Sequence, residues 1–229
     1  MGELRIVSKS STAFSGRGEA GDLLARELKA YGGQNIVVLG VPRGGVVVAL
    51  RIARALQGNL DMVLAHKLGA PGNPELAIGA VCEDGKLFID PQISSYVAAD
   101  ETYIEREKSR QLKEIGRRVK RYRDVLPKLP LGEKIVIVTD DGVATGATMQ
   151  AALWAVRQEQ PKKVVAALPV GPEDTLLKLA QDADQTICLQ APPFFSAISQ
   201  FYACFNQVQD DELLEILMEE STRRNRQRE

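Results

Sequence analysis

The chain has 229 residues, of which 45% are hydrophobic and 26% are charged. This length suits one large domain and is sufficient to bury a hydrophobic core. The formal net charge of −1 excludes a bulk attraction to nucleic acid or to an anionic membrane surface.

In chain order, apolar and amphipathic segments alternate as in an α/β protein. The predicted elements are a helix over 20–31, a strand over 35–41, a helix over 46–56, strands over 61–66, 77–82 and 87–90, a helix over 100–123, a strand ending at 139, a helix over 149–158, a strand over 163–170, a helix over 173–181, a strand over 185–190 and a helix over 210–220. The continuous apolar runs among the strands indicate burial on both faces, which is typical of a mostly parallel sheet.

The predicted helix over 100–123 carries a basic excess near its end. One apolar stripe, with Ile104 and Ile115 among its members, keeps helical spacing and can pack while the rest stays in water. The basic residues are Arg117, Arg118, Lys120, Arg121 and Arg123. They are compatible with contact to nucleic acid, but we expect a solvated helix face, which is the commoner origin of such a charge run.

Residues 135–148 carry the most functional information. An apolar strand ends in Asp140 and Asp141, and a short Gly/Thr loop leads into a helix. Backbone N–H groups and the helix dipole make such a loop a seat for phosphate, and the two carboxylates suit the hydroxyls of a ribose. The alternative is a plain Asp-Gly turn with a Thr N-cap. That alternative explains Gly142 and one Thr, but not the paired acids beside two Thr and a second Gly.

This segment resembles the phosphoribosyl-pyrophosphate (PRPP) signature of type I phosphoribosyltransferases. The shared pattern is four apolar residues, two acids, three variable positions and a Thr-Gly-Ala-Thr step. The resemblance implies that Asp140 and Asp141 hold the ribose hydroxyls and, directly or through water, Mg²⁺. It implies that the following loop wraps the 5-phosphate. The residues of that loop are Gly142, Val143, Ala144, Thr145, Gly146, Ala147 and Thr148.

The same resemblance implies a Rossmann-like fold, with helices on both faces of a mostly parallel sheet and a small hood above the strand ends. We expect one domain over residues 1–229. Within it, residues of about 191–208 are expected to form the hood, and the long helix over about 100–124 is expected to be an insertion.

A second candidate site is Val41-Pro42-Arg43-Gly44-Gly45. Two glycines allow backbone N–H groups to approach an anion, and Arg43 adds a fixed positive charge. The segment resembles the pyrophosphate-binding loop of the same family, which often has a cis peptide before the basic residue, here at Pro42–Arg43. The alternative reading is a plain Pro-Gly turn.

The third candidate is the Gly/Pro-rich segment over 67–75, which the turn-forming residues predict to be an exposed loop. In the resembled family, a mobile loop at this position closes over PRPP and excludes water. The resemblance implies that Lys67 reaches the pyrophosphate and that Glu75 acts as an acid or base. Alternatively, Lys67 is a surface lysine and Glu75 is a cap.

The acceptor is expected to bind at the hood, where Phe194 and Phe195 are candidates to stack on a base. Equally, these rings belong to the core of a small subdomain. Purine-type members often carry an Asp where this chain has Ala144, so this position supplies no side-chain base. For His66, the only histidine, we expect a structural or exposed role.

The resemblance runs from about Phe14 to residues 201–207, and is closest to a bacterial group of predicted phosphoribosyltransferases with unassigned acceptor. It implies Mg²⁺-dependent transfer of ribose 5-phosphate from PRPP to a nitrogenous base with release of pyrophosphate, as in nucleotide salvage. It also allows for a homo-oligomer. The alternatives are a non-catalytic regulator that senses PRPP or a nucleotide, and a protein that holds a ribose-phosphate nucleotide for hydrolysis or phosphorolysis.

The cellular compartment of the protein is predicted from its cysteines. Cys82, Cys188 and Cys204 are odd in number and form no Cys-x-x-Cys pair, which favours a reducing compartment. The sequence shows no signal-peptide pattern and no apolar run long enough to span a membrane. We therefore expect a cytoplasmic protein without a membrane partner.

Overall fold

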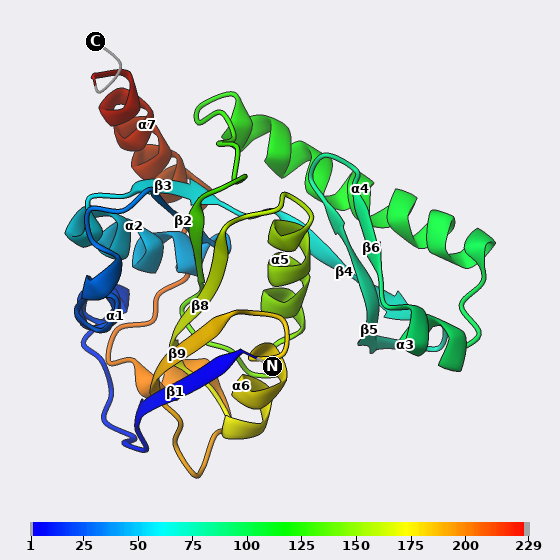
Figure 1. The fold of residues 1–229 in the computed structure, drawn as a ribbon, viewed down its shortest axis with the longest axis horizontal. Helices are drawn as coiled ribbons and strands as arrows, with labels where there is room; N and C mark the ends of the chain where they lie inside the picture. Colours follow the sequence, from blue (N-terminus) through cyan, green and yellow to red (C-terminus); the bar gives the residue numbers. More distant parts are fainter. Residues whose placement is uncertain (1, 227–229) are drawn as a thin grey trace.

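A computed structural model describes residues 2–226, except the side chains of Glu75 and Arg117. Its centre is a six-stranded sheet with the order β1-β9-β8-β7-β2-β3 (Figure 1). The strands are β1 (Glu3–Ser8), β2 (Ile36–Gly40), β3 (Asn59–Met62), β7 (Ile135–Thr139), β8 (Lys163–Val170) and β9 (Gln185–Gln190). Every neighbouring pair is parallel, which confirms the predicted α/β class.

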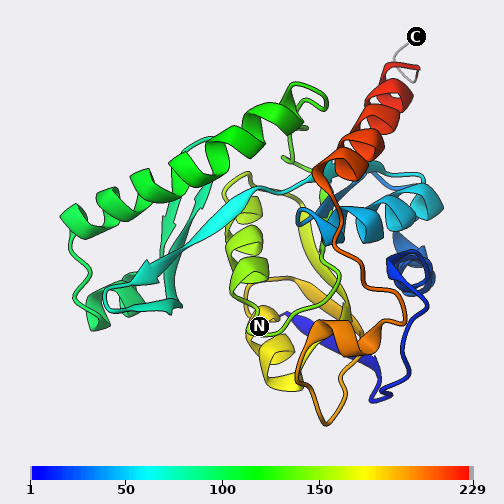
Figure 2. The same ribbon diagram turned by 180° about the vertical axis from the view of Figure 1, so that it is seen from behind.

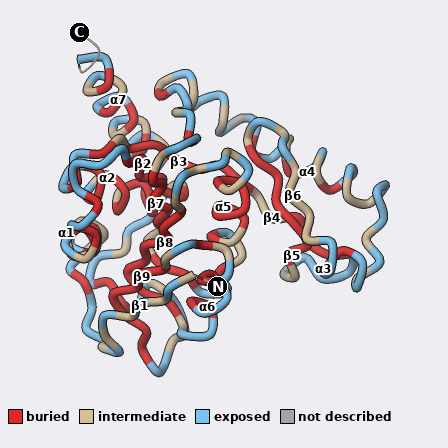
Figure 3. Tube along the Cα trace, viewed as in Figure 1, coloured by how far each residue is buried: buried red, intermediate tan, exposed pale blue. Residues whose placement is uncertain are grey.

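Helices cover both faces of this sheet. The helices are α1 (Arg17–Glu27), α2 (Gly44–Leu56), α5 (Ala147–Arg157), α6 (Glu173–Leu179) and α7 (Asp210–Arg226), with a 3-10 turn at Lys29–Tyr31. Successive residues of β2 alternate between two cores: Ile36 packs with α1, α2 and α7, and Val37 packs with α5 and α6. Figure 3 shows the resulting continuous burial along the central strands. Burial on both faces is the reason that these strands are apolar throughout.

A smaller antiparallel unit lies beside the main sheet (Figures 1 and 2). It consists of the sheet β4-β5-β6 with the helices α3 (Pro91–Tyr96) and α4 (Glu101–Arg123), where β4 is Ala65–Ala70, β5 is Asn73–Cys82 and β6 is Leu87–Ile89. Leu68 and Ile78 pack against apolar residues of α4 in a separate core. Phe88 of β6 contacts Trp154 of α5, with ring centroids 4.5 Å apart. This ring contact joins the antiparallel unit to α5, one of the helices that cover the main sheet.

Two local predictions were wrong in this region. The segment 67–75 is not a loop throughout, because it forms the end of β4, an exposed turn at Pro71 and Gly72, and the start of β5. Gly72 has a φ of +73°. The strand predicted over 61–66 is two strands, since β3 ends at Met62 in one sheet and β4 begins at Ala65 in the other. Neither β1 nor α3 was predicted. The helix predicted over 100–123 is confirmed as α4, and Arg118, Lys120 and Arg121 on it are exposed.

Residues 191–208 run across the carboxyl ends of the strands with one 3-10 turn at Ile198–Phe201. Tyr202 forms an isolated parallel bridge with Phe14, and their rings lie 5.4 Å apart. Phe201 is 1% exposed and belongs to the core shared with α1 and α2. The N-terminal segment before α1 therefore fixes the segment 191–208 to the main sheet.

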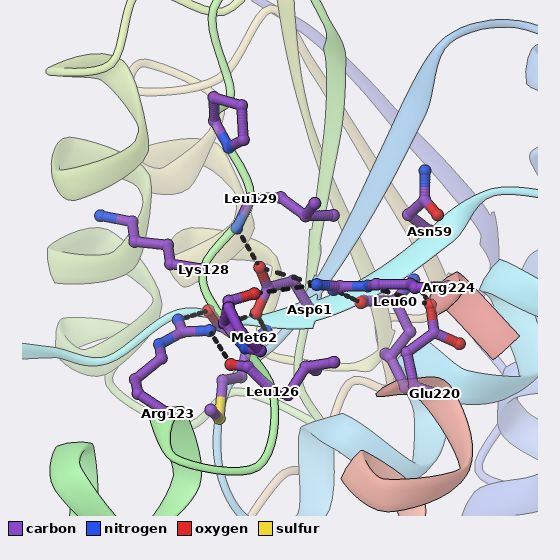
Figure 4. Close-up of polar contacts among 12 residues, drawn as sticks. Asn59, Leu60, Asp61, Met62, Arg123, Leu126, Lys128, Leu129, Glu220 and Arg224 are labelled. Carbon is purple, nitrogen blue, oxygen red and sulfur yellow. Dashed lines mark hydrogen bonds and ion pairs between the residues drawn. The ribbon is translucent and has the colours of Figure 1, made fainter. Parts of the chain in front are cut away.

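A buried ionic cluster secures the edge strand β3 (Figure 4). Asp61, which is 1% exposed, accepts hydrogen bonds from Arg123 Nη1 at 2.5 Å and from the Leu129 N–H at 2.8 Å. Arg224 of α7 lies 3.6 Å from the other side of the same carboxylate. Glu220 accepts a hydrogen bond from the Leu60 N–H at 3.1 Å. The cluster thus joins β3 to α7, to the end of α4 and to the connector that follows α4.

No helix in residues 2–226 combines the length and the hydrophobicity that crossing a bilayer requires. The three cysteines are unpaired: Cys82 and Cys188 are buried, and Cys204 is exposed. Burial raises the pKa of Cys82 to about 11 and that of Cys188 to about 12, so both remain protonated thiols near neutral pH.

Candidate functional site

The predicted site loops meet at the centre of the sheet. The strands β2 and β7 are adjacent and parallel, with Gly40 opposite Thr139 at their carboxyl ends. The loop after β2 and the loop after β7 therefore leave the sheet side by side. We name them by residues 41–45 and 140–148, and each range includes the first two residues of the helix that follows, α2 or α5. Ligands of open α/β sheets bind in this position, outside the carboxyl ends of the strands.

The two loops approach so closely that glycine is required. A Cβ on Gly44 would lie 2.0 Å from Asp141 Oδ2, and a Cβ on Gly45 would lie 2.8 Å from the Asp140 Cα. The Pro42–Arg43 peptide bond is cis, as the resemblance implies. The glycine pair thus has a specific role, which is to bring the loop that carries Arg43 against the two carboxylates.

Asp140 and Asp141 share a partly enclosed position at the end of β7. The Asp141 N–H donates a hydrogen bond of 2.8 Å to Asp140 Oδ1. Burial, followed by the charge of Asp141, raises the pKa of Asp140 well above its usual value. Burial also raises the pKa of Asp141, although the guanidinium of Arg17 acts against that rise. Of the two groups, Asp140 is therefore the one that more readily holds a proton.

Arg17 is a site residue that the sequence did not reveal. Its Nε and Nη2 atoms both lie 2.8 Å from Asp141 Oδ2, and both side chains are largely buried. The guanidinium also stacks over the Phe205 ring, 4.1 Å from its centroid, and donates to the Asn206 carbonyl at 2.8 Å. Arg17 is 124 residues from Asp141 in the chain, and no local motif marks it as a partner of the acids.

The loop 142–148 opens onto a surface pocket. Gly146 is the residue before α5 and has a φ of +79°, which places it in the left-handed region. The loop lines a pocket of about 470 Å³ together with Asp140 and Ile198. Thr145 and Thr148 are exposed at its rim. The first N–H groups of α5 lack partners within the helix, so this pocket has the properties of an anion seat.

Arg43 and Lys67 line two further cavities, both of which Thr148 also borders. Arg43 lines a cavity of about 760 Å³, and its Nη1 is 3.3 Å from Asp210 Oδ1. Lys67 lines a neighbouring cavity of about 830 Å³, in which Pro42 and Thr148 also take part. Glu75 is in β5, and its side chain lies outside the described part of the chain.

The two candidate aromatic residues differ in exposure. Phe194 is 85% exposed. Phe195 is half-buried and stacks on Phe201, with ring centroids 5.3 Å apart. Phe194 is therefore the one of the two whose ring is open to a ligand, whereas Phe195 also contributes to local packing.

The carboxylate pair suits one type of metal ion. Among the described residues, no group of three or more His, Cys, Asp or Glu side chains is placed to hold a metal. Mg²⁺ commonly binds through one or two carboxylates, with waters and substrate oxygens completing its shell. Asp140 and Asp141 fit this pattern, and they do not fit a site made wholly of protein ligands.

Replacement of Gly44 by alanine is expected to damage the site without unfolding the chain. The new methyl group would overlap Asp141 Oδ2 and lie 2.8 Å from Arg17 Nε, so the carboxylate must move. Overpacking of this kind costs roughly 1–3 kcal/mol. Gly18→Ala is the matched control, because a Cβ there has no neighbour within 4 Å. The measurements are the thermal midpoint and the PRPP affinity by calorimetry. Equal values for Gly44→Ala and Gly18→Ala would contradict the close approach of the two loops.

Comparisons with known proteins point to one family. The family model described as "Phosphoribosyl transferase domain" matches residues 17–205. Two Mycobacterium tuberculosis proteins, "Putative phosphoribosyl transferase Rv0571c" of strain H37Rv and "Putative phosphoribosyl transferase MT0597" of strain CDC 1551, are each 41% identical to the chain over 204 residues. The match covers 89% of this chain and 46% of each relative, so the chain spans about half the length of these relatives. The crystal structure of TT1426 from Thermus thermophilus superimposes with a TM-score of 0.87 at 46% identity, over 91% of this chain and 99% of that one.

Proposed function

Because the chain belongs to the phosphoribosyl transferase domain family, we propose that it transfers ribose 5-phosphate from PRPP to a nitrogenous acceptor and releases pyrophosphate. The observation that carries this proposal is the pair Asp140 and Asp141 at the end of β7. The pair lies between the pocket of residues 142–148 and the glycines of the loop after β2. PRPP is a ribose with phosphate groups at two opposite positions. It therefore matches a site in which two carboxylates lie between two anion-binding loops.

Each group of residues has a distinct role in this proposal. The carboxylates accept hydrogen bonds from the ribose 2′- and 3′-hydroxyls, and residues 142–148 hold the 5-phosphate. Arg43, Gly44 and Gly45 bind pyrophosphate, and Lys67 contributes a positive charge from β4. Holding both ends of PRPP fixes the C1 atom for attack, which lowers the entropic part of the barrier.

Mg²⁺ belongs to the proposal as a family property, and Asp140 and Asp141 are the residues that would hold it. When bound, it would neutralise the charge that develops on the pyrophosphate oxygens. Ala144 has no titratable side chain, so the loop itself does not remove a proton from the acceptor. Residues 191–208 remain the proposed hood, and Phe194 is the proposed stacking surface for a base.

Pyrophosphate release from PRPP and Mg²⁺, measured across a panel of purine and pyrimidine bases, tests this proposal. Release with one base would establish the transfer and identify the acceptor. Absence of release with every base, together with absence of PRPP binding in calorimetry, would refute both the transfer and the assigned ligand.

One observation favours a second candidate, a regulator that senses PRPP without transferring its ribose. Asp141 is paired with Arg17, and Arg43 contacts Asp210, so two proposed ligand-binding side chains already have protein partners. A ligand that displaces these partners would change the contacts of α1 and α7. PRPP binding without pyrophosphate release for any base would favour this candidate over the transferase.

A further inference from the structure

His66 lies at the edge of the antiparallel unit in a hydrogen-bonded chain of three side chains. Its Nδ1 is 2.9 Å from Gln111 Oε1, and Gln111 Nε2 donates to Glu107 Oε1 at 2.9 Å. Glu107 and Gln111 are each only 8% exposed, although both are polar. Side chains buried in this way are held in one orientation by the hydrogen bonds that they make.

The chain of hydrogen bonds fixes which nitrogen of His66 carries the proton. An ionised carboxylate only accepts hydrogen bonds, so Glu107 requires the amide nitrogen of Gln111 to face it. The amide oxygen of Gln111 then faces His66, and because this oxygen also only accepts, Nδ1 must be the donor. Arg110 hydrogen-bonds Glu107 and lowers its pKa, which keeps this carboxylate ionised. Nε2 makes no hydrogen bond to any described residue and is the nitrogen left for a ligand.

His66 faces the side of the site proposed for pyrophosphate. It lines both cavities that border Pro42 and Thr148, one shared with Arg43 and the other with Lys67. Neither cavity includes Asp140, Asp141 or residues 191–208. The charged side chains around them are Arg43, Lys67, Glu107, Arg110 and Arg118. Four of these side chains are positive, whereas the negative groups that face them are Glu107, paired with Arg110, and Asp210, paired with Arg43. Positive groups therefore remain in excess among the named residues, and the lining suits an anion.

We propose that His66 binds the pyrophosphate group of PRPP through Nε2 as an imidazolium, with Gln111 and Glu107 as its positioning residues. This inference rests on the proposed function. A neutral imidazole with Nδ1–H would direct the Nε2 lone pair at phosphate oxygens, so binding takes up a proton. As the C1–O bond breaks, its electron pair remains on the departing oxygen, and the Nε2–H group stabilises that charge. No covalent bond to His66 forms or breaks.

The test uses the imidazole signals of the untagged full chain, in which His66 is the only histidine. Nitrogen-15 NMR at about pH 8 distinguishes the two neutral tautomers from each other and from the imidazolium. In the free protein we expect the Nδ1–H form. Addition of inorganic pyrophosphate with Mg²⁺ is expected to protonate both nitrogens. Replacing Glu107 with glutamine is expected to produce a mixture of tautomers, because the Gln111 amide is then free to flip.

A pair of substitutions separates ligand contact from structure. His66→Asn keeps a donor at the Nδ1 position toward Gln111 and removes Nε2, and we expect it to weaken pyrophosphate binding about 10-fold or more. Lys120→Gln removes one positive charge from an exposed position of α4 outside both cavities and is expected to leave the affinity unchanged.

Two results overturn the inference while the proposed function stands. One is pyrophosphate binding, detected by calorimetry, that leaves the His66 nitrogen shifts unchanged. The other is equal affinity of wild type and His66→Asn. If neither PRPP nor pyrophosphate binds the wild-type chain, the proposed function fails and this inference fails with it.

Discussion

Replacing Asp140 and Asp141 together with asparagine is expected to abolish PRPP binding or turnover while the fold persists. Each carboxylate is proposed to accept a charged hydrogen bond from a ribose hydroxyl, and such bonds contribute about 1.5–3 kcal/mol each. Loss of both therefore predicts a fall in PRPP affinity of at least roughly 100-fold. Calorimetry with PRPP and Mg²⁺ measures this fall, and circular dichroism verifies the fold.

Asp140→Asn alone, which keeps the ion pair between Asp141 and Arg17, is expected to increase stability at neutral pH. Burial raises the pKa of Asp140 well above its usual value, so the folded chain holds this proton more tightly than the unfolded chain. The contribution of Asp140 to stability is therefore greatest at low pH and is lost as pH rises through the raised pKa. Asparagine does not titrate and avoids that loss. A gain in thermal midpoint at neutral pH that shrinks on acidification is the expected signature.

Asp22→Asn is the matched control for the PRPP affinity of the Asp140 and Asp141 double variant. Asp22 also pairs with an arginine, Arg51, but both side chains are well exposed and lie on the outer surface of α1 and α2. It should leave PRPP affinity unchanged. Unaltered affinity in the Asp140 and Asp141 double variant would sink the ribose assignment.

Replacing Asp61 with alanine is expected to destabilise the chain strongly. Asp61 is 1% exposed and neutralises Arg123 and Arg224, whose side chains are 13% and 8% exposed (Figure 4). Removal of one partner from a buried ion pair typically costs about 3–5 kcal/mol. Arg123 keeps Glu83 and Arg224 keeps Glu220 as partners, so we expect the lower end of that range. The Leu129 N–H also loses its acceptor. Urea unfolding followed by circular dichroism gives the change in the free energy of unfolding.

The control for this prediction is Asp124→Asn. Asp124 forms an ion pair with Lys120, and their side chains are 65% and 80% exposed. Exposed pairs of this kind contribute about 0–1 kcal/mol. If the Asp61 variant lost no more stability than the Asp124 variant, the cluster would be a consequence of the fold and would not stabilise it.

Local patterns were sufficient for the parallel sheet and for the loops at its centre. The strands β8 and β9 have the bounds that were predicted. Short apolar runs, residues 164–168 in β8 and 187–189 in β9, lie between turn-forming segments, a pattern that indicates strands buried on both faces. The β1 strand was not predicted. It lies at the sheet edge, where exposed and half-buried residues alternate and charges are tolerated.

The predictions that were wrong or incomplete concern contacts between distant parts of the chain. Turn-forming residues in 67–75 correctly indicate a reversal, but the pairing of β4 with β5 depends on packing against α4. Arg17 meets Asp141 only because the start of α1 lies beside the loop that follows β7. The orientation of His66 likewise depends on Gln111, 45 residues away. Such contacts become visible only when the chain is folded.

The contact between Phe88 and Trp154 gives the chain an intrinsic reporter. Trp154 is the only tryptophan, is 5% exposed, and donates to Asp182 Oδ1 at 2.8 Å. Because its ring lies between α5 and β6, its fluorescence depends on the docking of the antiparallel unit as well as on the integrity of the main sheet. If that unit separates first, the emission changes before the helical ellipticity of the main domain is lost. Divergence of these two unfolding curves would therefore mark a departure from two-state behaviour, with no added label.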